Sequence, residues 1–134
     1  MKGAIRILLL ASLGLSGCGL MPSAAVNLQA TEWRAVLVAG RQPVPGREPT
    51  LKFARGTLTG SGGCNHISGD FKNDGERFEI TGLGVNLVGC PAPIGEVEGA
   101  FVGALTQAQT VRFDGQNLVI GGSGGEIVLV RLDG

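Results

Sequence analysis

The chain has 134 residues, which is enough for one domain and too few for two. Eleven basic side chains balance eleven acidic ones, and this neutrality argues against a nucleic-acid-binding protein, which would carry a clear basic excess. The 24 glycines cluster at predicted turns, as expected for a β-rich chain.

The first eighteen residues have the pattern of an export signal. Lys2 and Arg6 precede an apolar run from Ile7 to Leu15 that is too short to span a bilayer. Leu15-Ser16-Gly17-Cys18 resembles the lipobox of bacterial lipoproteins, which implies cleavage before Cys18 and acylation of that cysteine. We therefore expect residues 1–17 to be a lipoprotein signal peptide and Cys18 to anchor an exported protein in a membrane of the cell envelope.

The residues after Cys18 bear on the membrane and on the start of the domain. Lipid must be the anchor, because no polybasic segment supports it. Gly19 stands where an aspartate would favour inner-membrane retention in enterobacteria-like sorting, so we expect the outer membrane, facing the periplasm. Residues 18–30 are small and weakly patterned, which predicts a flexible tether before a domain over 31–134.

The first half of the domain has the period-two pattern of strands. Strands are predicted at residues 33–38, 50–54, 57–59, 68–72 and 77–81. A loop rich in proline separates the first two, over residues 41–49. Asn73-Asp74-Gly75 is typical of a tight turn, so the last two strands should form a hairpin.

One segment has the spacing of a helix. Its apolar stripe consists of Ile94, Val97, Phe101, Leu105 and Ala108. Pro91 and Pro93 are typical of the start of a helix. Glu96 and Glu98 lie in its early turns, where the positive end of the helix dipole favours carboxylates. Three further strands are predicted at 111–113, 118–120 and 127–132. Many strands with short connections and one helix predict an α+β fold: a small curved antiparallel sheet or partial barrel with the helix packed on it.

The chain has three cysteines, and this number limits the disulfides and metal sites that it can form. If Cys18 carries lipid, Cys64 and Cys90 remain as an even pair in an oxidising compartment, which predicts a disulfide. The alternatives are two free thiols or a metal site of Cys64, His66 and Cys90, although zinc normally takes four ligands in paired spacing.

Candidate chemistry near these cysteines has structural explanations beside the functional ones. His66 is the single histidine, so a Cys–His mechanism would have to use it together with Cys64. The glycines of the 60–63 run lack the following helix and lysine of a phosphate-binding loop, and we interpret them as backbone requirements: positive φ or close approach. Asn65 is expected to cap the loop backbone, and Glu98 to reach loop amides near the Cys90 turn.

Aromatic side chains are few, at about one for each predicted element. This distribution predicts a shared core layer that includes Trp33, rather than an exposed sugar- or base-stacking platform. The set comprises Trp33, Phe53, Phe71, Phe78, Phe101 and Phe113.

The segment from Gly60 to Phe71, GSGGCNHISGDF, resembles the G-x-x-GCN-x-x-x-G-x-[YF] signature of META/HslJ domains. The matching positions are Gly60, Gly63, Cys64, Asn65, Gly69 and Phe71, and the resemblance extends to Trp33, Cys90, Glu98, Phe101 and Leu105. One departure is the run Asn86–Cys90, which lacks the basic residue that family members often carry before the second cysteine. The family implies small envelope proteins, often lipoproteins, linked to heat stress or antibiotic tolerance, with no established enzyme activity or cofactor.

The sequence therefore predicts a non-catalytic, monomeric envelope protein that acts in stress or antibiotic tolerance through an unidentified protein partner. It predicts no cofactor, no metal and no nucleic acid. The alternatives are a periplasmic binding module, such as a hydrolase inhibitor or small-ligand carrier, and an enzyme that uses Cys64 and His66.

Overall fold

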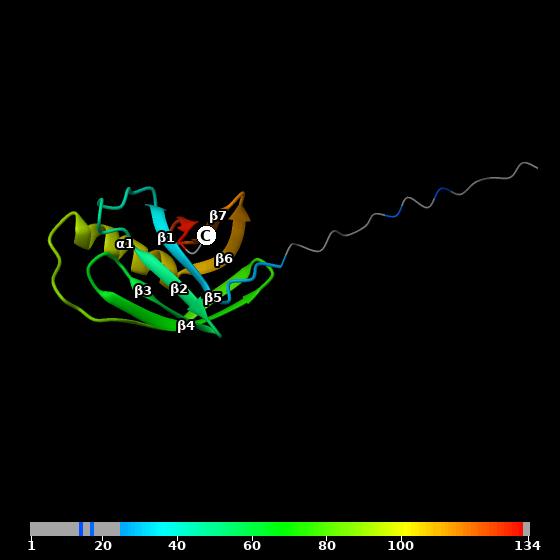
Figure 1. The fold of residues 1–134 in the computed structure, drawn as a ribbon, viewed down its shortest axis with the longest axis horizontal. Coiled ribbons are helices and arrows are strands. Elements are labelled where there is room, and N and C mark those ends of the chain that lie inside the picture. The colour runs from blue at the N-terminus through cyan, green and yellow to red at the C-terminus, as the bar shows by residue number, and fades with distance from the viewer. Residues whose placement is uncertain (1–13, 15–16, 18–24, 133–134) are drawn as a thin grey trace, which may run out of the picture.

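The structure, a computed structural model, describes residues 14, 17 and 25–132 (Figure 1). The signal peptide expected over residues 1–17, apart from Gly14 and Gly17, and the acylated Cys18 lie outside the described residues. The elements in chain order are β1 (Thr31–Val38), β2 (Thr50–Ala54), β3 (Thr57–Ser61), β4 (His66–Asp74), β5 (Arg77–Val85), α1 (Ile94–Thr106), β6 (Ala108–Asp114), β7 (Asn117–Gly122) and β8 (Ile127–Arg131). Among the described residues, no helix is long and apolar enough to cross a membrane.

The eight strands form a closed antiparallel barrel in which each strand pairs with the next. Closure is made by β8 against β1, from Trp33↔Arg131 to Val38↔Ile127. The expected antiparallel sheet with one helix is present, but a partial barrel was too open a description, because this last pairing closes the sheet on itself.

The joint between β5 and β6 differs from the others. One residue pair, Arg77↔Thr110, defines its register, and the N–H of Val111 donates to the carbonyl of Glu76 at 2.9 Å. The chain leaves β5 at Val85 and returns through α1 before it enters β6. Along most of its length, therefore, β5 has a register partner in β4 alone within the described residues.

Two-residue turns join β2 to β3, β4 to β5 and β6 to β7, and the sequence predicted the second of them at Asn73-Asp74-Gly75. The β2–β3 turn uses Arg55 and Gly56, both with positive φ (47° and 79°), which matches the twist of a two-residue hairpin. Gly75 has a φ of 57° in the β4–β5 turn, where an L side chain would be strained.

Side chains fill the barrel, as is usual for eight strands. Trp33, Phe53 and Phe101 are almost fully buried, and the Phe53 ring meets the Phe71 ring edge-on with centroids 4.9 Å apart. Phe113 is an exception to the predicted core layer: it is 43% exposed and its ring centroid lies 6.2 Å from that of Trp33.

Two segments close the barrel interior at different places. The buried face of α1 carries Val97, Phe101 and Leu105; the helix ends at Thr106, and Ala108, expected in its stripe, begins β6. Val26 and Leu28 are also buried, so residues 26–30 belong to the folded domain and not to the tether in which we placed them.

Candidate functional site

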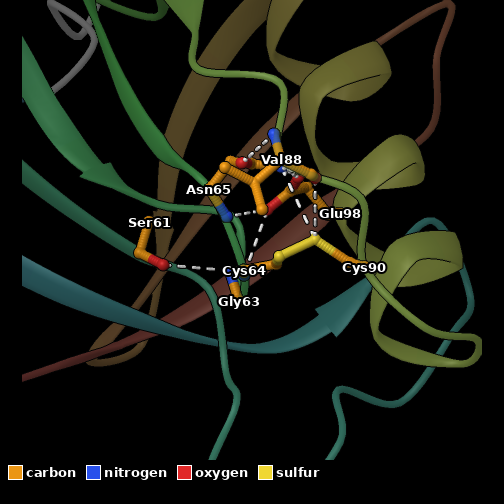
Figure 2. Close-up of a disulfide and its surroundings, with 7 residues drawn as sticks. All are labelled: Ser61, Gly63, Cys64, Asn65, Val88, Cys90 and Glu98. Carbon is orange, nitrogen blue, oxygen red and sulfur yellow. Dashed lines mark hydrogen bonds between the residues drawn. A yellow bond between two sulfur atoms is a disulfide. The ribbon is translucent and has the colours of Figure 1, made fainter.

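A cystine joins two loops at one end of the barrel. Cys64 lies in the connection from β3 to β4, Cys90 lies in the segment that leads from β5 to α1, and their sulfur atoms form the expected disulfide (Figure 2). The cystine therefore ties the β3–β4 connection to the segment that leads into α1, 26 residues further along the chain. We call this region the cystine end, defined by residues 62–65 and 86–93.

Glu98 projects from α1 into the cystine end (Figure 2). One carboxylate oxygen, Oε2, accepts the N–H of Cys64 at 3.1 Å and the N–H of Asn65 at 2.6 Å. The other oxygen, Oε1, accepts a hydrogen bond from the Asn65 side-chain amide. The residue is only 7% exposed. Burial removes the water that would otherwise solvate its carboxylate, and the three protein donors compensate for that loss.

We correctly predicted that Glu98 binds loop amides, but we predicted the wrong loop. We expected amides near the Cys90 turn, whereas the carboxylate binds the amides of Cys64 and Asn65. The helix brings its buried face, and Glu98 with it, against the β3–β4 connection because Val97 and Phe101 are packed in the core.

Asn65 is the link between the two loops. Its Nδ2 donates to the carbonyl of Val88 at 3.1 Å, and its Oδ1 accepts the N–H of Val88 at 2.8 Å. A side-chain amide thus pairs with Val88 as a neighbouring peptide group would. The expected local cap was wrong, since Asn65 stabilises a segment 23 residues away instead of its own loop.

The glycines of this region meet backbone and buried groups at close range. A Cβ at Gly60 would lie 2.0 Å from the Thr50 carbonyl oxygen, and one at Gly62 would lie 2.5 Å from Cγ of Glu98. Gly63 has a φ of +107°, which L side chains rarely adopt. Gly69 opposes a bulge in the β4–β5 pairing, and a Cβ there would approach Leu83 Cα at 3.3 Å.

The proline-rich loop that packs on Gly63 holds one group with a shifted pKa. A Cβ at Gly63 would lie 2.6 Å from the carbonyl oxygen of Arg47, which shows how closely the loop approaches. Next to it, the pKa of the Glu48 carboxyl is lowered because backbone N–H groups of Glu48 and Gly46 donate to its charged form. Glu48 is exposed, so this effect concerns the loop alone.

The chemical options at the cystine end are narrow. Cys64 and Cys90 sulfurs and a Glu98 carboxylate oxygen lie within 4.8 Å of one another, but the sulfurs are bonded to each other and the carboxylate already accepts three hydrogen bonds. Within the described residues, His66 is not part of this group. It is exposed on β4, opposite Ser61.

Two apolar side chains stand exposed beside the cystine. Leu87 is 92% exposed and Val88 is 62% exposed, and both border a hollow of about 310 Å³ between the end of β5 and the outer side of α1. Other residues of its wall are Val85, Gly95, Gly99 and Val102. A second hollow, of about 1040 Å³, lies near the other end of β5, with Phe78, Glu79, Thr106 and Gln109 among its lining.

Sequence reasoning missed this surface. We noted the run Asn86–Cys90 only as a departure from a family pattern. The signal that could have revealed it is charge: every residue from Thr81 to Gly95 is uncharged, which is unusual for a loop that faces water.

The fold and this cluster define a class: a small antiparallel eight-stranded barrel, packed by one helix and held by one cystine that a buried carboxylate supports. The META domain model matches residues 26–133, and the chain belongs to the META domain family. The match begins at Val26, which is also the first buried residue of the part of the chain that the structure describes.

Solved structures share the fold. One is an NMR structure of a protein from Burkholderia xenovorans, 24% identical, with a TM-score of 0.65 over 80% of this chain and 85% of that one. Another NMR structure is 22% identical, with a TM-score of 0.67 over 79% and 92%. A DUF4847 family protein from Bacteroides vulgatus is 17% identical, with a TM-score of 0.54 over 77% and 93%. A search of curated proteins found no match.

Proposed function

We propose that this chain is an exported envelope protein, anchored by lipid on Cys18, whose META domain binds other proteins and performs no catalysis. Its place is the outer membrane, facing the periplasm, and its role is in envelope stress or antibiotic tolerance, as the resemblance to META/HslJ lipoproteins implies. The observation that carries the proposal is the pair of exposed apolar residues, Leu87 and Val88, held in place beside a cystine.

Holding such side chains in one conformation favours binding. A water-exposed leucine contributes nothing to the core, and a loop that is already ordered loses little conformational entropy when a partner packs on it. The disulfide and the paired hydrogen bonds of Asn65 provide that order.

The state of the thiols supports the non-catalytic part of the proposal, because it bears on the Cys–His mechanism considered from the sequence. Cys64 is the one cysteine near His66 in sequence, and its sulfur is bonded to Cys90. A nucleophilic cysteine needs a free thiolate, so the oxidised cystine end offers no nucleophile for a Cys–His mechanism. The cystine also suits an oxidising compartment, where a lipoprotein signal would deliver the chain.

A second candidate is a carrier of a small apolar ligand. The hollow of about 310 Å³ beside Leu87 favours it, because that volume lies at the lower limit of pockets that hold small molecules. The exposure of Leu87 argues for the protein-binding function first, since a carrier would enclose its apolar side chains.

The mass of the protein purified from envelope membranes tests the proposal. We expect a chain that begins at Cys18, carries two or three fatty acyl chains, and is two hydrogens lighter than the reduced form. A Cys18→Ala variant should retain its signal peptide and carry no acyl chains. An intact Met1, a mass without acyl groups, or two reactive thiols in the folded native protein would contradict the proposal.

A further inference from the structure

Two features of the cystine end point to the kind of partner it binds. The surface around Leu87 is uncharged, and β5, the strand that leads to it, has a single register pair with β6 among the described residues. We define the β5 ledge as Val85, Leu87, Val88, Gly99 and Val102, which surround the smaller hollow.

Charge restricts the partner. Every residue from Thr81 to Gly95 is uncharged, and the one acidic side chain that borders the hollow, Glu98, is buried and accepts three hydrogen bonds from the protein. A charged partner segment would lose its water here without gaining an ion pair. The chemistry that fits is an uncharged segment with apolar side chains.

The free side of β5 restricts the partner's conformation. From Phe78 to Val85, β5 pairs in register with β4 except at Gly82 and Leu83, where the register shifts. On its other side this stretch has no register partner among the described residues, and its Val85 end faces α1 across the smaller hollow. Unpaired strand edges bind extended chains through backbone hydrogen bonds, while alternate side chains enter neighbouring pockets. An extended chain along the end of β5 that finishes at Val85 would place an apolar side chain beside Leu87.

The place where the chain enters the domain bears on whether the membrane or the tether, and not a protein, would occupy the β5 ledge. β4 starts at His66, next to the cystine end, and finishes beside Asn73, whose Nδ2 donates to the Val26 carbonyl at 2.6 Å. Val26 thus lies about one strand length, roughly 25 Å, from the cystine end; in Figure 1 the chain enters at the right, while the segment before α1 lies at the left. The described chain therefore enters the domain at the end of the barrel opposite the cystine end.

We infer that the β5 ledge is the partner-binding surface of this domain, and that its occupant is an uncharged, apolar segment of another envelope protein, bound in extended conformation along β5. The inference rests on the proposed function for the presence of a protein partner, and it adds the site and the chemistry of what binds there.

Photo-crosslinking in the native cells tests this inference. The probe is p-benzoylphenylalanine in place of Leu87, and the same residue in place of Leu132 is the control. Leu132 is another exposed leucine, 49% against 92% for Leu87, but its N–H donates to the Glu32 carbonyl near the start of β1, at the entry end. We expect position 87 to give a discrete protein adduct whose crosslinked peptide is uncharged, apolar and strand-forming, and position 132 to give none.

A matched pair of helix variants shows whether the hollow is used. Gly99 and Gly103 both lie in α1 with nothing within 4 Å of an added Cβ, so Gly99→Leu and Gly103→Leu should both fold, but only Gly99 borders the hollow. The adduct yield at position 87 should fall at least tenfold in Gly99→Leu and stay within twofold in Gly103→Leu.

Several results would overturn the inference. They are an adduct with lipid, with a second copy of this chain or with residues 18–24, a crosslinked segment rich in charge, equal yields in the two helix variants, or no adduct. The mass of Cys18 is measured separately. An unlipidated protein that still gives the mapped adduct would remove the anchor from the account and leave the β5 ledge in place.

Discussion

Replacement of both Cys64 and Cys90 by alanine is expected to lower the free energy of unfolding by about 3–4 kcal/mol. The disulfide closes a loop of 26 residues, and without it the unfolded chain gains conformational freedom that folding must then remove. The paired change avoids a lone thiol. Urea denaturation of the double variant and of the oxidised parent protein measures the difference.

The reduced parent protein is the matched control for this experiment. Its stability should fall by a similar amount, because reduction removes the same covalent constraint without changing side-chain packing. A loss below 1 kcal/mol in both proteins would mean that the cystine contributes little to the fold, and that Asn65 and Glu98 alone hold the two loops.

Glu98→Ala is expected to destabilise the domain by about 3 kcal/mol. The change leaves three donors, the N–H groups of Cys64 and Asn65 and the Asn65 side-chain amide, without their acceptor in a buried site. Glu98→Gln should cost less, about 1–2 kcal/mol, since one amide oxygen still accepts while the new NH₂ group faces donors. Denaturant unfolding of the oxidised proteins gives both values.

Glu96 provides the control two residues away on the same helix. Its carboxylate is 3.6 Å from the Arg41 guanidinium, and both side chains are more than half exposed. Such a pair contributes little, so Glu96→Ala should change stability by no more than about 0.5 kcal/mol. Equal effects at positions 96 and 98 would contradict the role we assign to the buried carboxylate.

Local patterns predicted most elements of the fold. Alternating apolar residues marked the strands, the stripe from Ile94 to Leu105 marked the helix, and Asn73-Asp74-Gly75 marked a hairpin. Closure of the barrel could not be predicted. It depends on the pairing of β8 with β1, which lie at opposite ends of the domain sequence, and no local pattern indicates that pairing. The burial of Val26 and Leu28 was missed for the same reason: two apolar residues are too few to show a period.

The candidate site was predicted in its composition and not in its connections. Cysteine count and compartment predicted the Cys64–Cys90 pair, and the family pattern drew attention to Asn65 and Glu98. Which loops these two side chains join depends on how α1 docks against the β3–β4 connection, and helix docking is a tertiary property. Leu87 was missed because a single exposed leucine forms no periodic pattern; the signal that the sequence did offer was the uncharged run from Thr81 to Gly95.

The account depends on one physical property: an exposed apolar segment is held rigid by a buried polar cluster. Hydrogen exchange of the Val88 amide in the oxidised protein measures it most directly, because that N–H lies in a residue open to water. It donates to Oδ1 of Asn65 at 2.8 Å and, within its own loop, to the Asn86 carbonyl at 3.1 Å. We expect it to exchange at least a hundredfold more slowly than in an unfolded chain, and to lose that protection in Asn65→Ala while the core amide of Leu129 keeps its own. Exchange of Val88 at the unfolded rate in the oxidised parent protein would contradict the account.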